Sequence, residues 1–326
     1  MQHRLCISKR VLVAHAIRIC FVPLLAGCGG DSKDSGADPS LDGAADTSPD
    51  DAPRFSFFVT SLAALQSLSG NPEGFGGDLR FGQPDGLSGA DEICRQISLR
   101  SMPGNVKMWR AFLSVTRGPT GEPVHAIDRI GDGPWYDRVG RVVAMNKDDL
   151  VQTRPRGADP AIVNDLPNED GVPNHNPQGT GNVDNHDMLT GTSTSGTLFS
   201  TDWGATCHDW TSSVGSDGRP HCGHTWPTGS GNGGPGNMIF DGGPGGPIPD
   251  GAIILRDGGF RFDGEMRPPG FDGGRGGDLA NWMSALDESG CAPGVNLIET
   301  GPPNPSHDTV GSGGGYGGFY CFALTP

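Results

Sequence analysis

Residues 317–324 read GGFYCFAL, a pair of glycines followed by an unbroken run of aromatic and apolar side chains. Aromatic and apolar residues of this kind are typical of strands that lie in a protein core, and glycines commonly mark the turn before such a strand. We therefore expect a buried strand at 317–324, close to the end of the chain.

Other regular elements are expected upstream of this strand. Three apolar or aromatic stretches predict further strands, at 55–61 (FSFFVTS), 108–114 (MWRAFLS) and 139–145 (VGRVVAM). A helix is expected at 89–97 (GADEICRQI), with Ser88 as its N-cap and acidic residues in its first turn. Strands and a helix in this order indicate a mixed α+β domain.

The glycine and proline content predicts that the rest of the domain consists mainly of turns and loops. The chain has 55 Gly and 28 Pro in 326 residues, which favours long turns and irregular loops over helical bundles. Residues 153–187 are rich in Asn, Asp, Pro and Gly and are expected to form a long loop. Residues 229–278 have uneven Gly and Pro spacing, which excludes a collagen repeat and indicates an insertion with one strand at 251–256.

The first residues have the pattern of a secretory signal. Basic residues precede a short apolar run, and Leu25-Ala26-Gly27 stands directly before Cys28. The apolar run is about half of the ~20 residues that would span a bilayer. Residues 1–27 are therefore predicted to be a cleaved signal peptide of the bacterial lipoprotein type, with Cys28 as the acylated residue that holds the protein on the lipid bilayer.

The segment after Cys28 and the overall charge narrow the choice of partners. Residues 28–53 are acidic and nearly free of large apolar groups, so we expect a disordered tether before the domain at 54–326. A net charge of −15 argues against nucleic acid and other polyanions as ligands. Gly29 stands where some bacteria place an inner-membrane retention aspartate, so the expected location is the outer membrane of the cell envelope.

Six strings, in order, resemble bacterial lipoprotein domains of unknown function that are related to endostatin and to the C-type lectin-like fold. They are FFVTS (57–61), GLSGADEIC (86–94), WRAFLS (109–114), TGTSTSGT (190–197), CHDWTSS (207–213) and FYCFAL (319–324). The resemblance covers most of residues 55–326. It implies a small antiparallel sheet, one or two helices and long loops.

The resemblance also implies nested disulfides, Cys94 with Cys321 and Cys207 with Cys291. Cysteine counting alone indicates only an oxidised, exported framework with one thiol left over. Cys222 departs from the family pattern, and a short Cys207–Cys222 bridge that frees Cys291 is an alternative. The long Gly/Pro insertion is a second departure.

Two groups of residues carry side chains that could bind a metal ion. Cys207, His208, His221, Cys222 and His224 carry zinc-ligand atoms, but their spacing differs from known zinc motifs, and a disulfide at Cys207 would remove a ligand. Hard oxygen ligands suited to calcium occur on loops, and C-type lectin-like domains often use such oxygens. The candidate calcium ligands are Asp165, Glu169, Asp170, Asp184 and Asp187.

Two tryptophans are the candidates for ligand contact. Trp203 and Trp226 lie in polar loops, where a flat ring can stack on a sugar, whereas Trp109, Trp210 and Trp282 stand in or beside apolar strings and are assigned to the core.

No catalytic signature is found: the sequence has no G-x-S-x-G elbow and no HExxH helix. The sequence therefore favours a membrane-anchored, non-enzymatic binding domain for a glycan, matrix or protein ligand. The alternatives are a structural envelope protein that assembles through its Gly-rich insertion, and a metal-dependent envelope hydrolase.

Overall fold

The last strand, β11 (Tyr320–Ala323), is the middle strand of a three-stranded antiparallel sheet with β1 (Phe57–Val59) and β2 (Trp109–Ala111). In this computed structural model Cys321 lies opposite Phe58 on one side and Ala111 on the other. All three strands lie within the expected ranges but are shorter. Just before β1, for example, the Ser56 N–H donates to the carbonyl oxygen of Tyr136 (2.8 Å), which belongs to a strand outside this sheet.

The structure describes residues 54–163, 166–173, 187–225, 281–297 and 303–326, together with the backbone of two strands at 252–254 and 260–262. All of these residues belong to one compact unit, Pro49–Pro326. The predicted signal peptide, Cys28, the tether and most of the 229–278 insertion lie outside the described residues.

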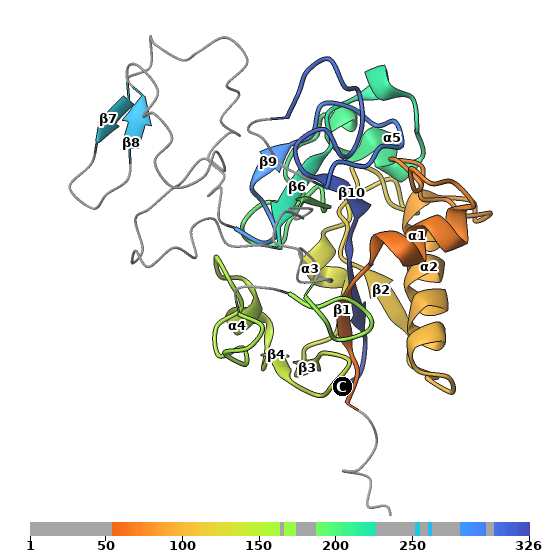
Figure 1. Cartoon of the computed structure of the whole chain (residues 1–326), viewed down its shortest axis with the longest axis vertical. Coiled ribbons are helices and arrows are strands. Elements are labelled where there is room, and N and C mark those ends of the chain that lie inside the picture. Colours follow the sequence, from red (N-terminus) through yellow and green to blue (C-terminus); the bar gives the residue numbers. More distant parts are fainter. Residues whose placement is uncertain are drawn as a thin grey trace, which may run out of the picture. The chain divides into compact units, whose positions relative to one another are not determined.

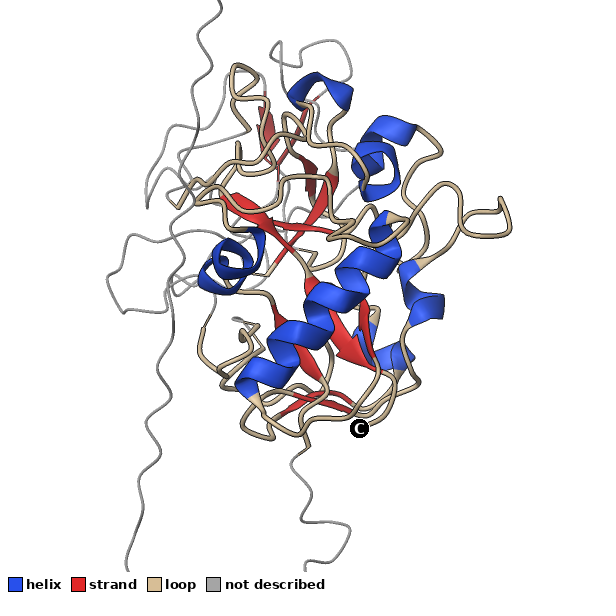
Figure 2. Cartoon of the chain, turned by 90° about the vertical axis from the view of Figure 1, so that its right-hand side faces the viewer, coloured by secondary structure: helices blue, strands red, loops and turns tan. Residues whose placement is uncertain are grey.

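Helix α2 (Gly86–Ser101) covers one face of this sheet (Figure 2). It is longer than the expected 89–97, and its N-cap is Asp85, not Ser88, because the Asp85 carboxylate accepts a hydrogen bond from Ser88 N–H (2.8 Å). No acidic residue lies in its first turn. Its buried face includes Ala90, Ile93, Cys94 and Ile97, which have helical spacing. No helix in the described part of the chain is long and apolar enough to cross a membrane.

A second, four-stranded sheet has the order β10 (Gly315–Gly318), β5 (Asp187–Leu189), β6 (His221–His224) and β9 (Leu286–Asp287). The expected strand at 317–324 is in fact divided between the two sheets. The division falls at Phe319, whose N–H donates to Thr60 Oγ1 (3.0 Å) instead of pairing within a strand. Asp187, expected in a loop, begins β5.

The remaining elements are short (Figure 1). The expected strand at 139–145 is β4 (Val142–Ala144), which pairs with β3 (Trp135–Tyr136). The expected strand at 251–256 is β7 (Ala252–Ile254), and it pairs with β8 (Phe260–Phe262). The other short helices are α1 (Leu62–Ser69), α3 (Ala126–Arg129), α4 (Lys147–Leu150), η2 (Trp203–Thr206), α5 (Cys207–Trp210) and η3 (Gly215–Asp217). The domain is therefore α+β, with small sheets and few helices.

Two disulfides connect distant parts of the chain. Cys94 in α2 is bonded to Cys321 in β11, and Cys207 is bonded to Cys291; Cys222 is buried and unpaired. These are the pairs that the family resemblance implies, and the alternative Cys207–Cys222 bridge does not occur. The bonded cysteines are 227 and 84 residues apart, and loop entropy assigns each bridge about 4–5 kcal/mol.

Candidate functional site

The turn formed by Cys207, His208, Asp209 and Trp210 has an unusual backbone. All four residues have left-handed φ angles, of 47°, 58°, 58° and 63°, although none is glycine. Each such residue costs about 1–2 kcal/mol in this conformation. Backbone strain of this kind persists only where the surroundings fix it, and it is concentrated at functional sites.

The Asp209 carboxylate is the main group that fixes the turn. It accepts hydrogen bonds from Thr116 N–H (2.6 Å), from Thr116 Oγ1 (2.9 Å) and from the indole Nε1 of Trp203 (3.0 Å). The ends of the turn are also held, because Cys207 is in a disulfide and the buried Trp210 donates its Nε1–H to Ser114 O (2.9 Å). The turn is therefore attached to the core on both sides.

Trp203 of η2, His208 of this turn and Arg117, which follows β2 in the chain, lie together at the surface, and we call them the Trp203 cluster. The His208 ring is stacked 4.8 Å from the Trp203 ring, and the Arg117 guanidinium is 5.4 Å from its centroid. Trp203 nevertheless remains 46 % exposed. The exposed Arg117 guanidinium makes no ion pair with any described residue. The cluster thus combines an aromatic surface with a free cation.

Of the two tryptophans predicted to contact a ligand, Trp203 lies on the surface, and Trp226 lies outside the described residues. Trp109, Trp210 and Trp282, which were assigned to the core, are all buried. The surface or core location predicted from the sequence is therefore correct for these four tryptophans.

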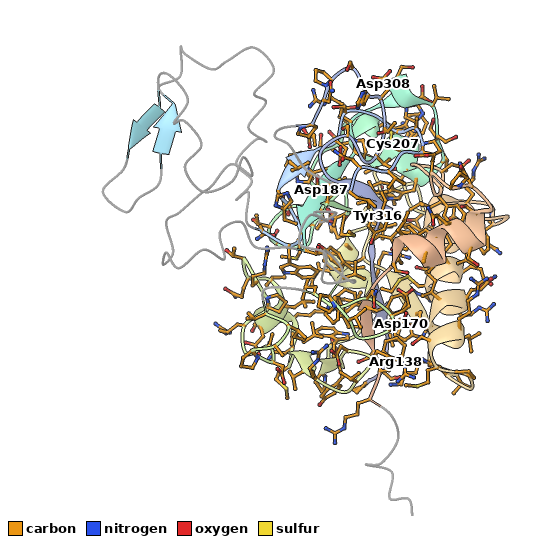
Figure 3. All side chains as sticks on the ribbon, in the orientation of Figure 1. Arg138, Asp170, Asp187, Cys207, Asp308 and Tyr316 are labelled. Carbon is orange, nitrogen blue, oxygen red and sulfur yellow. A yellow bond between two sulfur atoms is a disulfide. The ribbon has the colours of Figure 1, made fainter. Side chains whose placement is uncertain are left out.

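The predicted calcium ligands do not come together in the described part of the chain. Glu169 is buried and accepts hydrogen bonds from Ser61 N–H (3.0 Å) and Ser61 Oγ (2.5 Å), and burial raises the pKa of its carboxyl group. Asp170, next to it, lies well away from Asp187 (Figure 3). Asp165 and Asp184 lie outside the described residues. Among the described residues, no three Asp, Glu, His or Cys side chains are grouped as a metal ion would require.

The five zinc candidates are also separated. Cys207 is in a disulfide, His208 lies at the surface, and His221, Cys222 and His224 are buried in β6. The oxidised Cys207 cannot be a metal ligand.

Strand β6 carries a hydrogen-bonded constellation that the sequence analysis missed. His221 Nδ1 is 2.6 Å from Asp287 Oδ1, and His221 Nε2 is 2.8 Å from Ser284 Oγ. These are the contacts of a Ser-His-Asp triad. However, His221 is fully buried and Ser284 is 1 % exposed, so no substrate reaches the hydroxyl in this structure. The two hydrogen bonds of His221 connect β6 with Asp287 of β9 and with the nearby Ser284.

A second buried acid–base group lies on the other side of β6. His224 Nε2 is 2.8 Å from Asp187 Oδ1, and the two residues are paired in register between β5 and β6. Glu288 lies beside Asp187, and its Oε2 accepts hydrogen bonds from Ser312 Oγ (2.5 Å) and Gly313 N–H (2.8 Å). Burial and the Asp187 charge raise the pKa of Glu288 well above its usual range. The folded protein therefore holds the Glu288 proton to a higher pH than the unfolded chain does.

Burial, with the nearby carboxylates of Glu288, Asp187 and Asp287, likewise raises the pKa of the Cys222 thiol. This thiol is kept neutral and out of solvent, so it has neither the charge nor the access of a reactive cysteine. No signal in the sequence HCGH reveals either histidine pair, because the pairing depends on strand register rather than on local spacing.

Comparison with known proteins assigns no function to these residues. No family model matches the chain, and no curated protein matches it.

The raised pKa of Glu288 predicts a specific pH dependence of stability. The unfolded chain loses the Glu288 proton near pH 4.3, about where a free glutamate titrates, and the folded chain loses it at a higher pH, so this group lowers stability as pH rises between the two. Glu288→Gln keeps an uncharged amide in the same place. The variant should therefore gain stability over the wild type by up to about 1.4 kcal/mol per pH unit.

The measurement is urea unfolding of both proteins between pH 5 and 8. Glu122→Gln, which changes an exposed glutamate, is the control and should show no such trend. A constant free-energy difference between Glu288→Gln and the wild type across this range would contradict the raised pKa of Glu288.

Proposed function

We propose that this protein is a lipid-anchored, extracytoplasmic binding domain without catalytic activity, and that the Trp203 cluster is its ligand site. The anchor is the acylated Cys28, and the location is the outer membrane. The α+β architecture, the long loops and the nested disulfides support a relation to the endostatin and C-type lectin-like domains. This relation remains part of the proposal.

The observation that best supports this ligand site is that the ring of Trp203 is both exposed and held in one orientation. A ring that is 46 % exposed offers apolar surface to a ligand, and its bond to Asp209 (3.0 Å) fixes its orientation before binding. A site that is ordered in advance binds with a smaller entropy cost. The strained turn beneath it is the kind of feature that concentrates at binding sites.

A neutral glycan is the ligand that fits these properties best. The apolar face of a sugar ring complements an exposed indole, and the Arg117 guanidinium and the His208 imidazole lie close enough to bond its hydroxyl groups. The net charge of −15 disfavours acidic polysaccharides over the surface as a whole.

Replacing Trp203 tests the ligand site. A glycan array probed with the full mature protein identifies a neutral glycan ligand, and calorimetry then compares its affinity across variants. Trp203→Ala should weaken binding at least tenfold, because the stacking surface is lost. The matched control is Val139→Ala, which also removes an exposed apolar side chain (62 % exposed) but lies outside the cluster. Unchanged affinity in Trp203→Ala, or no binding to any neutral glycan, would refute the proposed site.

Replacing Cys28 tests the anchor. The wild-type protein should partition into the detergent phase and carry acyl chains on its first residue, whereas Cys28→Ala should not be acylated. Cys20→Ala, which lies within the predicted signal peptide, should leave the mature protein unchanged. Detergent partitioning of Cys28→Ala equal to that of the wild type would show that another segment binds the membrane.

A further inference from the structure

A cleft of about 610 Å³ lies between the first half of α2 and the outer edge of β2. Its size is within the range of about 300–1,000 Å³ that is typical of small-molecule sites. Its lining includes Asp91, Val106, Met108, Trp109, Arg110 and Arg129, and none of the residues of the Trp203 cluster. The cleft is therefore separate from the proposed glycan site.

The edge of β2 in this cleft is closed to another strand. Ala111 N–H donates to Asp91 Oδ1 (2.9 Å), and Arg129 donates to the carbonyl oxygen of Ala111. These are the backbone groups that an added strand would need at this position. An extended peptide paired along β2 is accordingly disfavoured, and a ligand must be recognised by the side chains of the cleft.

Those side chains carry an excess of positive charge. Asp91 receives a bidentate pair of hydrogen bonds from Arg129 (2.7 and 2.9 Å) and also lies 3.3 Å from Arg110. One carboxylate is thus shared by two guanidinium groups. The Arg129 side chain is 9 % exposed and held by Asp91, whereas Arg110 is 37 % exposed and its contacts, with Asp91 Oδ2 (3.3 Å) and with Trp109 O (3.2 Å), are both longer. Arg110 is therefore the group that is placed to receive an anion.

Apolar surface lies next to this cation. Val106 is 93 % exposed and Met108 is 62 % exposed, which is uncommon for large apolar side chains in the same segment. The indole Nε1 of Trp109, which also lines the cleft, is buried and has no hydrogen-bond partner in the structure as described. This atom is out of reach of a ligand, so the groups of the cleft that a ligand can contact are the exposed side chains of Val106, Met108 and Arg110.

We propose that this cleft binds a free aliphatic carboxylate, with its carboxylate on Arg110 and its alkyl chain on Val106 and Met108. The charge selects an anion, and the exposed apolar side chains select an alkyl chain. A short acid such as acetate satisfies only the first requirement, and an alkylammonium satisfies only the second.

The test uses calorimetry of the full mature protein with octanoate, octylammonium, octanol and acetate as probes. Octanoate should bind saturably, octanol at least tenfold more weakly, and octylammonium and acetate not measurably. Arg110→Gln and Met108→Asp should each weaken octanoate binding at least tenfold, because one removes the cation and the other places a negative charge on the apolar surface.

Two controls match these substitutions. Arg156→Gln changes another exposed arginine, and Val139→Asp places a charge at a position that is as exposed as Met108, both outside the cleft. Both should keep wild-type affinity for octanoate. The proposal is refuted if octanoate does not bind, if octylammonium binds equally well, or if the cleft variants bind octanoate as the wild type does. None of these outcomes bears on glycan binding at Trp203.

Discussion

The disulfide between Cys94 and Cys321 is the constraint on which the rest of the architecture depends. It joins the middle of the only long helix in the described part of the chain to the central strand of the three-stranded sheet. Because Cys321 lies between Phe58 and Ala111 in the sheet, the bridge attaches the helix to the strand that pairs with both of the others. The strands are three or four residues long, and sheets this small gain stability from such a helix and crosslink.

The second bridge, between Cys207 and Cys291, has a different role. It lies at the start of the left-handed turn, and the unfavourable backbone there is offset by the disulfide and by the hydrogen bonds of Asp209. The result is a rigid surface that presents Trp203 and His208. Stability in one part of the domain therefore permits a strained, ordered site in another, which is the expected relation between a scaffold and a binding loop.

The elements that sequence reasoning predicted are those with a strong local signal. The aromatic run at 55–61 and the run at 319–324 are strands because composition alone favours them, and the apolar spacing around Cys94 forms a helix for the same reason. The division of the last strand at Phe319 could not be predicted, since it depends on a hydrogen bond to Thr60, which is distant in sequence.

The polar core was beyond prediction for a related reason. The strands DML, HCGH and LD are too short and too polar to stand out, and His221 and His224 find their acids only through strand register. Asp187 and Glu169 were expected to bind calcium on loops, yet both carboxylates are used inside the fold, by His224 and Ser61. A carboxylate in a polar sequence does not reveal whether its partner is an ion or another part of the chain.

Mass spectrometric mapping of peptides from the non-reduced protein tests this account most directly. The structure requires one crosslinked peptide pair that contains Cys94 and Cys321, a second that contains Cys207 and Cys291, and a free thiol at Cys222. A bridge between Cys207 and Cys222, or a fully reduced domain, would contradict both the fold and the strained turn that supports Trp203.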